Sequence, residues 1–203
     1  MDFKIHESFQ NVVQGEGYHA GRPCDFIRLY GCPVGCYFCD TGYAKDNTTK
    51  IMKYKIPQEK LLDDLKSNFV VISGGEPFIH KNINVLCENL IQINKDVAIE
   101  TSGAFYQNVN DKVWITLSPK HHISPKYPVK QEVWQRANEL KIVVDTGYEL
   151  DFYKDFIINF NGYKYLQPEF DDMEKTLPLV LKLLQTHQDF KLSLQTHKII
   201  GVR

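Results

Sequence analysis

The chain has 203 residues, of which 43% are hydrophobic and 24% charged, an ordinary composition for a folded globular protein. Its formal net charge of −1 gives no global electrostatic reason to expect nucleic acid or membrane binding. No apolar run approaches the roughly 20 residues of a membrane span, and the opening MDFKIHESFQ lacks the apolar core of a signal peptide. We therefore expect a single cytoplasmic domain over 1–203, with neither nucleic acid nor a membrane as partner.

Apolar runs rich in β-forming residues alternate along the chain with helix-like runs. In chain order they predict a strand at 24–30, a helix at 57–66, a strand at 69–73, a helix at 82–93, strands at 97–101, 113–117, 140–144 and 163–167, a helix at 173–186 and a last strand at 190–195. This alternation is typical of βα units and a mostly parallel sheet. About six such strands are too few for a closed eight-stranded barrel, so an open, partial TIM-like barrel with few helices is expected.

Polar and glycine-rich residues follow directly after several predicted strands, at 31–32, 73–76, 100–102, 118–120 and 167–168. In parallel α/β folds the reactive groups lie at the carboxyl ends of the strands, which meet at one face of the molecule. The sequence therefore predicts a functional pocket on that face.

Three of the five cysteines, Cys32, Cys36 and Cys39, form a C-x3-C-x2-C loop directly after the first predicted strand. Thiolates are the natural ligands of iron–sulfur clusters. Three cysteines leave one iron of a [4Fe–4S] cubane open, and an open iron can chelate the amino and carboxylate groups of S-adenosylmethionine (SAM). The alternative is a zinc-stabilised binding module without catalysis, but structural zinc takes four ligands and the chain has no second C-x-x-C pair.

The cysteine loop, together with the segment Gly74-Gly75-Glu76-Pro77 after the next predicted strand, resembles the radical SAM superfamily. The second segment is similar to that superfamily's GGEP motif, whose backbone contacts the methionine amino group of SAM. The resemblance implies a radical SAM fold and a reaction begun by reductive cleavage of SAM.

Further features narrow the resemblance, and they run from about residue 5 to the last residue. They are Gln14-Gly15-Glu16-Gly17, Arg28, Asp40-Thr41, Ser118-Pro119-Lys120 and the tail 192–198, LSLQTHK. Together they are similar to the 7-carboxy-7-deazaguanine synthase family. That family converts 6-carboxy-5,6,7,8-tetrahydropterin to 7-carboxy-7-deazaguanine with loss of ammonia, in queuosine and 7-deazapurine biosynthesis. The resemblance implies a [4Fe–4S] cluster, SAM and Mg²⁺ as cofactors, a reductant such as flavodoxin, and a homodimer.

The same resemblance implies a role for individual residues, with no catalytic side chain beyond the cluster and SAM. Thr41 matches a magnesium ligand. The expected SAM-binding residues are Phe38, Cys39, Asp40, Gly75, Glu76, Glu100, Ser118, Pro119, Lys120 and Gln167. The expected substrate-binding residues are Val13, Gln14, Gly15, Glu16, Arg28, Ser73, His197 and, through its main chain, Arg203.

Residue chemistry fits several of these roles, and a few positions depart from the family pattern. The planar fork of Arg28 suits a substrate carboxylate, and magnesium prefers oxygen ligands such as the Thr41 hydroxyl, although a helix-capping threonine is an alternative. Phe38 stands where many members carry tryptophan, and Ser73 where threonine is common. Glu169-Phe170 departs from the residues that usually follow Gln167-Pro168.

A glycyl-radical-activating enzyme is the other enzyme that shares the C-x3-C-x2-C loop at this length. Such an enzyme acts on a large protein partner and needs no pterin pocket. The segment 14–17 and the tail favour the synthase.

Overall fold

The computed structural model describes residues 2–43 and 53–203. Its described strands form one sheet in the order β3-β1-β2-β4-β5-β6-β7-β8-β9. The strands are β1 (Asp2–Val13), β2 (Pro23–Leu29), β3 (Tyr54–Pro57), β4 (Phe69–Gly74), β5 (Asp96–Thr101), β6 (Trp114–Leu117), β7 (Glu139–Val144), β8 (Tyr163–Pro168) and β9 (Phe190–Leu192). The helices are α1 (Gln58–Asp63), α2 (Ile83–Gln92), α3 (Gln131–Arg136), α4 (Glu149–Ile157), α5 (Met173–Thr186) and α6 (Thr196–Ile199).

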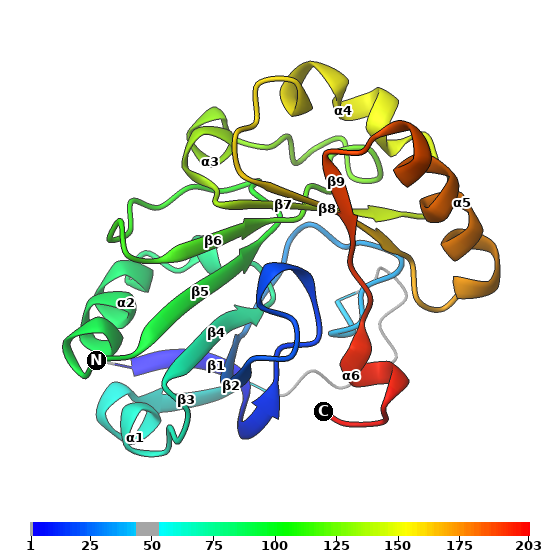
Figure 1. Ribbon diagram of the computed structural model, residues 1–203. Coiled ribbons are helices and arrows are strands. Elements are labelled where there is room, and N and C mark those ends of the chain that lie inside the picture. The colour runs from blue at the N-terminus through cyan, green and yellow to red at the C-terminus, as the bar shows by residue number, and fades with distance from the viewer. Residues whose placement is uncertain (1, 44–52) are drawn as a thin grey trace.

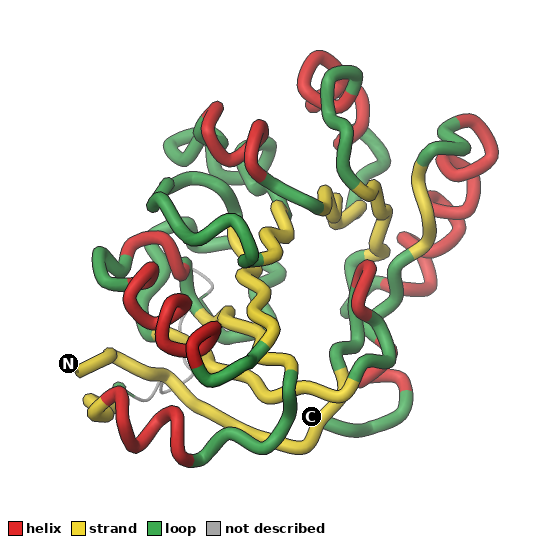
Figure 2. The backbone as a smooth tube through the Cα atoms, turned by 60° about the vertical axis from the view of Figure 1, so that its left-hand side comes forward, coloured by secondary structure: helices red, strands yellow, loops and turns green. Residues whose placement is uncertain are grey.

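Strands β2 and β4 to β9 run parallel to one another, and β1 pairs antiparallel with both β2 and β3. The sheet curves into an arc that stays open, with helices on its outer side (Figures 1 and 2). The expected open barrel of mostly parallel strands is confirmed, and all seven predicted strands are present. Strands β1 and β3 and the short helices α3, α4 and α6 were not predicted.

Burial on both faces explains why the parallel strands are almost continuously apolar. The outer face packs against the helices, where α2 contributes buried Ile83, Leu86 and Leu90 to the main core. The inner face holds a smaller cluster that includes Cys24 and Phe69. The arc is thus packed with side chains at one end and hollow only at the carboxyl ends of its strands.

The C-terminal segment leaves the sheet earlier than predicted and then runs to the loop between β1 and β2. Strand β9 ends at Leu192, and α6 follows after three residues of irregular chain. The backbone N–H of Thr196 donates to the carbonyl of Gly15 (3.0 Å), so the tail lies beside the loop that joins β1 to β2 (Figure 1). None of the helices in the described part of the chain combines the length and apolar character of a membrane span.

Candidate active site

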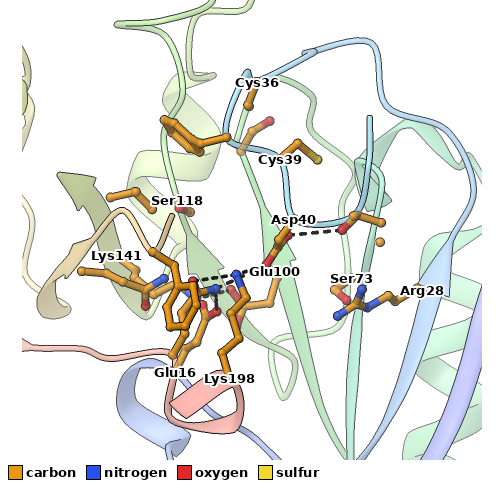
Figure 3. Close-up of a pocket in the computed structure, with 18 of the residues that line it drawn as sticks. Glu16, Arg28, Cys36, Cys39, Asp40, Ser73, Glu100, Ser118, Lys141 and Lys198 are labelled. Carbon is orange, nitrogen blue, oxygen red and sulfur yellow. Dashed lines mark hydrogen bonds and ion pairs between the residues drawn. The ribbon is translucent and has the colours of Figure 1, made fainter. Parts of the chain in front are cut away.

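A cavity of about 560 Å³ lies at the carboxyl ends of the strands, a volume within the range of small-molecule sites. The predicted site residues that line it are Val13, Gln14, Glu16, Arg28, Cys32, Cys36, Phe38, Cys39, Asp40, Thr41, Ser73, Gly75, Glu76, Glu100, Ser118, Lys120, Gln167, His197 and Arg203. Gly15 and Pro119 are the two that do not. In Figure 3, Cys36 and Cys39 lie at one end, Glu16, Lys141 and Glu100 gather in another part, and Arg28 lies beside Ser73.

The cysteine loop follows β2 through Gly31, whose φ of +104° favours glycine. Cys32, Cys36 and Cys39 are half-buried and free of disulfides. Burial raises the pKa of Cys32 to about 12 and also raises the pKa of Cys36. A cysteine ligates a metal as its thiolate, so binding of a cluster would displace the proton of each thiol that it engages. The three cysteines therefore fit the cluster expected from the sequence.

The Gly74-Gly75-Glu76 turn braces the cysteine loop. A Cβ at position 75 would lie 1.9 Å from the carbonyl oxygen of Gly31, and the N–H of Glu76 donates to that oxygen at 2.9 Å. The Glu76 carboxylate is 1% exposed and accepts hydrogen bonds from the hydroxyls of Thr101 (2.6 Å) and Ser102 (2.5 Å). The glycine is thus required by close packing against the chain's own loop, and the glutamate joins the ends of β4 and β5.

Lys141 on β7 lies at the centre of a buried charge cluster. Its Nζ is 2.5 Å from Oε2 of Glu16 and 3.0 Å from Oε2 of Glu100. Burial alone would raise the pKa of Glu16, but Lys141 and hydrogen bonds from neighbours lower it to about 2. Burial raises the pKa of Glu100 despite Lys141, in part because the Glu16 charge is close. Glu16 is therefore the permanent anion of this cluster and Glu100 the carboxyl that accepts a proton more readily.

Lys120 reaches the cavity from the segment after β6. Its ammonium donates to the carbonyl (2.8 Å) and hydroxyl (2.6 Å) oxygens of Ser118, and burial lowers its pKa, an effect that Cys36 opposes. It forms no carboxylate ion pair among the described residues. Lys120 is thus a half-buried amine beside the cysteine loop, suited to a ligand carboxylate.

Arg28 lies on the opposite side of the cavity, paired in register with Ser73 of β4. Its Nη1 is 3.3 Å from Oε1 of Glu7 on β1, while its Nε is buried without a hydrogen-bond partner. Glu7 also contacts the guanidinium of Arg203, and both arginines lie over the ring of Phe9. Arg28 therefore keeps a donor available for a ligand, and Glu7 draws the end of the tail to the same wall.

The tail and the loop after β1 form another wall together. A Cβ at Gly15 would lie 1.9 Å from Nδ1 of His197, so Gly15 supports His197 from behind the cavity. The side-chain amide of Gln195 donates to Glu16 (2.6 Å) and to Asp40 (3.3 Å). Burial lowers the pKa of His197, although Glu16 opposes this, so its ring is mainly neutral at pH 7.

Three other predicted residues have local partners. The hydroxyl of Thr41 is 3.4 Å from Oδ1 of Asp40, which brings two oxygen ligands to the same side of the cavity. Oε1 of Gln167 accepts a hydrogen bond from Ser193 (2.7 Å), and the Ser193 hydroxyl in turn accepts from the N–H of Gly17 (2.9 Å). Gln167 therefore joins β8 to the tail as well as lining the cavity.

Several cavity residues were missed from the sequence. They include Glu7 behind the wall and, in the lining, Lys141, Gln195, Lys198 and Phe170. Lys141 carried a signal, because a lysine inside the apolar run ELKIVV needs a buried partner or a function. Glu7 carried none, since β1 itself was not predicted.

Comparison with known proteins agrees with this site. The Radical SAM superfamily model matches residues 26–113. The 7-carboxy-7-deazaguanine synthases of Synechocystis sp. (strain PCC 6803) and Escherichia coli (strain K12) are 34% and 31% identical, over 100% of this chain and 95% and 100% of theirs. That of Flavobacterium psychrophilum is 32% identical over 94% of this chain and 89% of its own. The crystal structure of QueE from Escherichia coli superposes with a TM-score of 0.80 at 29% identity, covering 96% of this chain and 94% of that one.

The resemblance inferred from the cysteine loop, the glycine turn and the tail is thus confirmed, and neither the glycyl-radical activase nor the zinc-stabilised module is needed to explain them. The open parallel barrel and the cavity at its carboxyl edge are what such an enzyme requires. The chain belongs to the 7-carboxy-7-deazaguanine synthase family of radical SAM enzymes.

Proposed function

We propose that this chain converts 6-carboxy-5,6,7,8-tetrahydropterin to 7-carboxy-7-deazaguanine with loss of ammonia, as a lyase of queuosine and 7-deazapurine biosynthesis. The observation that carries the proposal is that the cysteine loop and Arg28 line one cavity. Relatives that match the whole chain bear the name of this activity.

We assign Cys32, Cys36 and Cys39 to three irons of a [4Fe–4S] cluster. When bound, the cluster and SAM supply the 5′-deoxyadenosyl radical that takes a hydrogen atom from the pterin. The residues assigned to SAM are Phe38, Cys39, Asp40, Gly75, Glu76, Glu100, Ser118, Pro119, Lys120 and Gln167. Lys120 supports this assignment because its half-buried ammonium lines the cavity with the cysteine loop and suits a carboxylate. Glu76 contributes through its main chain, since its carboxylate is already satisfied by Thr101 and Ser102.

The substrate carboxylate is assigned to Arg28, whose buried Nε has no protein acceptor among the described residues. Glu7 holds Nη1 and leaves Nε and its neighbouring donor for a two-point contact. The Ser73 hydroxyl lies beside this site in the sheet register. These contacts orient the pterin and leave its ring directed into the cavity.

The hydrogen-bonding edge of the pterin is assigned to Val13, Gln14, Gly15 and Glu16, with His197 and the main chain of Arg203 from the tail. The carboxylate of Glu16 stays ionised, because its pKa is about 2, so it accepts hydrogen bonds from ring N–H groups. Gly15 acts from behind, through its contact with His197.

Magnesium is assigned to Thr41, together with substrate oxygens. The support is chemical: a hydroxyl and the nearby Asp40 carboxylate offer oxygen ligands at the cavity wall. Magnesium keeps several waters in most protein sites, so a single protein ligand is enough to place it.

We further propose that residues 1–203 act as one domain in a cytoplasmic homodimer that takes electrons from a reductant such as flavodoxin. One sheet connects β1 to β9, and all the cysteines are free, as in a reducing compartment. The tail exposes Ile199, Ile200 and Val202, and a second copy of the chain would bury such an apolar surface.

The test is anaerobic reconstitution of the cluster, followed by incubation with SAM, a reductant and 6-carboxy-5,6,7,8-tetrahydropterin. We expect mass spectrometry to detect 7-carboxy-7-deazaguanine and an equal amount of ammonia. Reductive cleavage of SAM without this product, by protein with a full complement of iron and sulfide, would reject the substrate while keeping the radical chemistry.

A further inference from the structure

Three metal-ligating side chains meet outside the catalytic cavity. His122 lies in the segment after β6, Asp145 directly follows β7, and Glu149 begins α4. One ligand atom from each lies within 4.8 Å of the other two. Asp145 is 8% exposed and Glu149 is 0% exposed, and none of the three lines the cavity. They form a cluster separate from that cavity, in which both carboxylates are buried and His122 is half-buried.

Two atoms of this cluster are buried without a hydrogen-bond partner, namely Oδ1 of Asp145 and Nε2 of His122. Nδ1 of His122 is engaged by the hydroxyl of Tyr153 at 2.9 Å, and the backbone N–H of His122 donates to the same hydroxyl at 3.1 Å. Nε2 is therefore the ring nitrogen left to bind a ligand. Buried polar atoms nearly always have a partner, so this pair points to a group that completes the cluster.

Glu149 is already held in place by the turn that precedes α4. Its Oε1 accepts hydrogen bonds from the N–H groups of Asp145 (3.2 Å) and Thr146 (2.9 Å) and from the Thr146 hydroxyl (2.8 Å), whereas its Oε2 accepts only from the N–H of Gly147 (2.9 Å) among the described residues. Backbone donors thus fix the carboxylate before any ligand arrives. A site with one fixed carboxylate, one buried carboxylate and an oriented imidazole is largely preorganised.

We propose that His122, Asp145 and Glu149 bind a divalent cation of the zinc type, in addition to the cluster held by the cysteines. One imidazole nitrogen and two carboxylate oxygens are a ligand set that zinc accepts, with water in the fourth position. Metal–ligand distances near 2.0–2.1 Å place tetrahedral ligands about 3.4 Å apart. The widest pair, at 4.8 Å or less, therefore closes by at most about 1.4 Å when the ion binds.

The position of His122 in the fold suggests a structural role for the ion. The segment 118–124 carries Ser118 and Lys120 in the cavity, and its Ser124 hydroxyl donates to the carbonyl of Val34 in the cysteine loop (2.7 Å). His122 lies between these contacts. A metal at His122 would fasten this segment to β7 and α4, and so position both the Lys120 ammonium and the cysteine loop.

The competing state of the same cluster is a proton shared between Asp145 and Glu149, with no metal. The amide of an Asp145→Asn variant donates to Glu149 as a protonated carboxyl would, so the variant is expected to fold. Asp151→Asn is the matched control, because Asp151 lies exposed on the same helix, α4, and outside the cluster. His122→Gln is the second variant if Asp145→Asn folds poorly.

The experiment uses the reconstituted holoenzyme with SAM bound, equilibrated anaerobically with zinc and then passed through a desalting column. Zinc, iron and sulfide per chain are measured by elemental and sulfide analysis. We expect about one zinc per chain in the wild type and in Asp151→Asn, with iron unchanged, and loss of that zinc in Asp145→Asn and His122→Gln. Zinc should also raise the melting temperature of the wild type and not that of Asp145→Asn.

Equal amounts of zinc retained by the wild type and by Asp145→Asn would overturn the proposal. The absence of retained zinc in both would also overturn it, and would favour the proton shared between Asp145 and Glu149. Zinc retained at the expense of iron would place the ion on the cysteine loop and would also overturn it. None of these three results bears on the synthase activity, because the readouts are metal content and melting temperature.

Discussion

Nζ of Lys141 lies 2.5 Å from a carboxylate oxygen of Glu16, although the two residues are 125 positions apart in the chain. A second carboxylate, from Glu100 on β5, lies 3.0 Å from the same atom. The ion pairs join β7, β5 and the loop after β1 at one point of the cavity wall. The cluster therefore contributes both to the stability of the fold and to the charge of the site, and each contribution can be tested.

Replacing Lys141 with Met should destabilise the folded chain by about 3 kcal/mol, because removing one partner of a buried pair leaves an uncompensated charge. The pKa of Glu16, now about 2, should rise in the variant. Urea unfolding of Lys141→Met at pH 7 measures the loss, with Lys154→Met on the exposed face of α4 as control. Pairing Lys141→Met with Glu16→Gln should recover part of the stability, and a loss below about 0.5 kcal/mol would show that water already compensates the cluster.

Lys141 also shows which features the sequence predicts and which it does not. The strand carrying it was predicted, since an apolar run between turn residues is a local property of the chain. Its partners were not, because pairing between β7, β5 and the loop at 14–17 depends on how distant segments fold together. Glu16 and Glu100 were assigned to the site through family resemblance, whereas Lys141 between them carried only the local signal of a lysine in an apolar run, which names no partner.

The same distinction holds for the fold. The parallel strands were identified because burial on both faces leaves nearly continuous apolar sequence, as in Phe69–Gly74. Strand β1 was not predicted because its alternation of buried and exposed residues is interrupted around Glu7 and Asn11. At these positions its register with β2 shifts, and Asn11 has a φ of +58°. The last strand was predicted at 190–195, but β9 ends at Leu192. Ser193 is compatible with a strand in sequence, but in the structure its hydroxyl donates a hydrogen bond to Gln167.

Arg28→Ala should raise the KM for the pterin at least tenfold and leave the iron content and the cleavage of SAM unchanged. The reason is the loss of a two-point contact to the substrate carboxylate. Arg28→Lys should recover little, because an ammonium lacks the planar fork. Steady-state kinetics with Arg22→Ala as control, an arginine paired with Asp96 away from the cavity, provide the comparison. An unchanged KM would remove Arg28 from the substrate site.

Cys36→Ala should lose the cluster, the broad absorbance of the cluster at about 400 nm and all turnover together. Cys87→Ala is the matched control, because Cys87 lies on α2 and is fully buried in the core. This variant should retain its full iron content. Iron and sulfide analysis after anaerobic reconstitution measures both variants. A Cys36→Ala protein with full iron content and normal activity would contradict the ligand assignment.

Glu139 should make stability depend on pH. Burial raises its pKa to about 7 from 4.5, helped by Glu100 and opposed by Lys141. Between these values the folded chain holds a proton that the unfolded chain releases, so this contribution is complete below pH 4.5 and lost as pH rises through 7. At most about 3.5 kcal/mol is involved, at about 1.4 kcal/mol for each unit between 4.5 and 7.

Urea unfolding at pH 5 and pH 7.5 for wild type and Glu139→Gln measures this effect. The wild type should lose more stability than the variant over that interval. The difference between the two proteins is the readout, because His19, with a pKa lowered to about 4 by burial, acts in the opposite direction in both. Parallel pH profiles would exclude a protonated Glu139.

Because the arc stays open, the described sheet ends in two edge strands, β3 and β9, of four and three residues. A longer open edge would offer a row of backbone donors and acceptors to any other unpaired strand. Here Lys191 stands exposed in the middle of β9, and the chain turns into α6 soon afterwards. The opening that admits ligands is thereby bordered by an edge poorly suited to recruiting other chains, which protects the enzyme from aggregation through its own sheet.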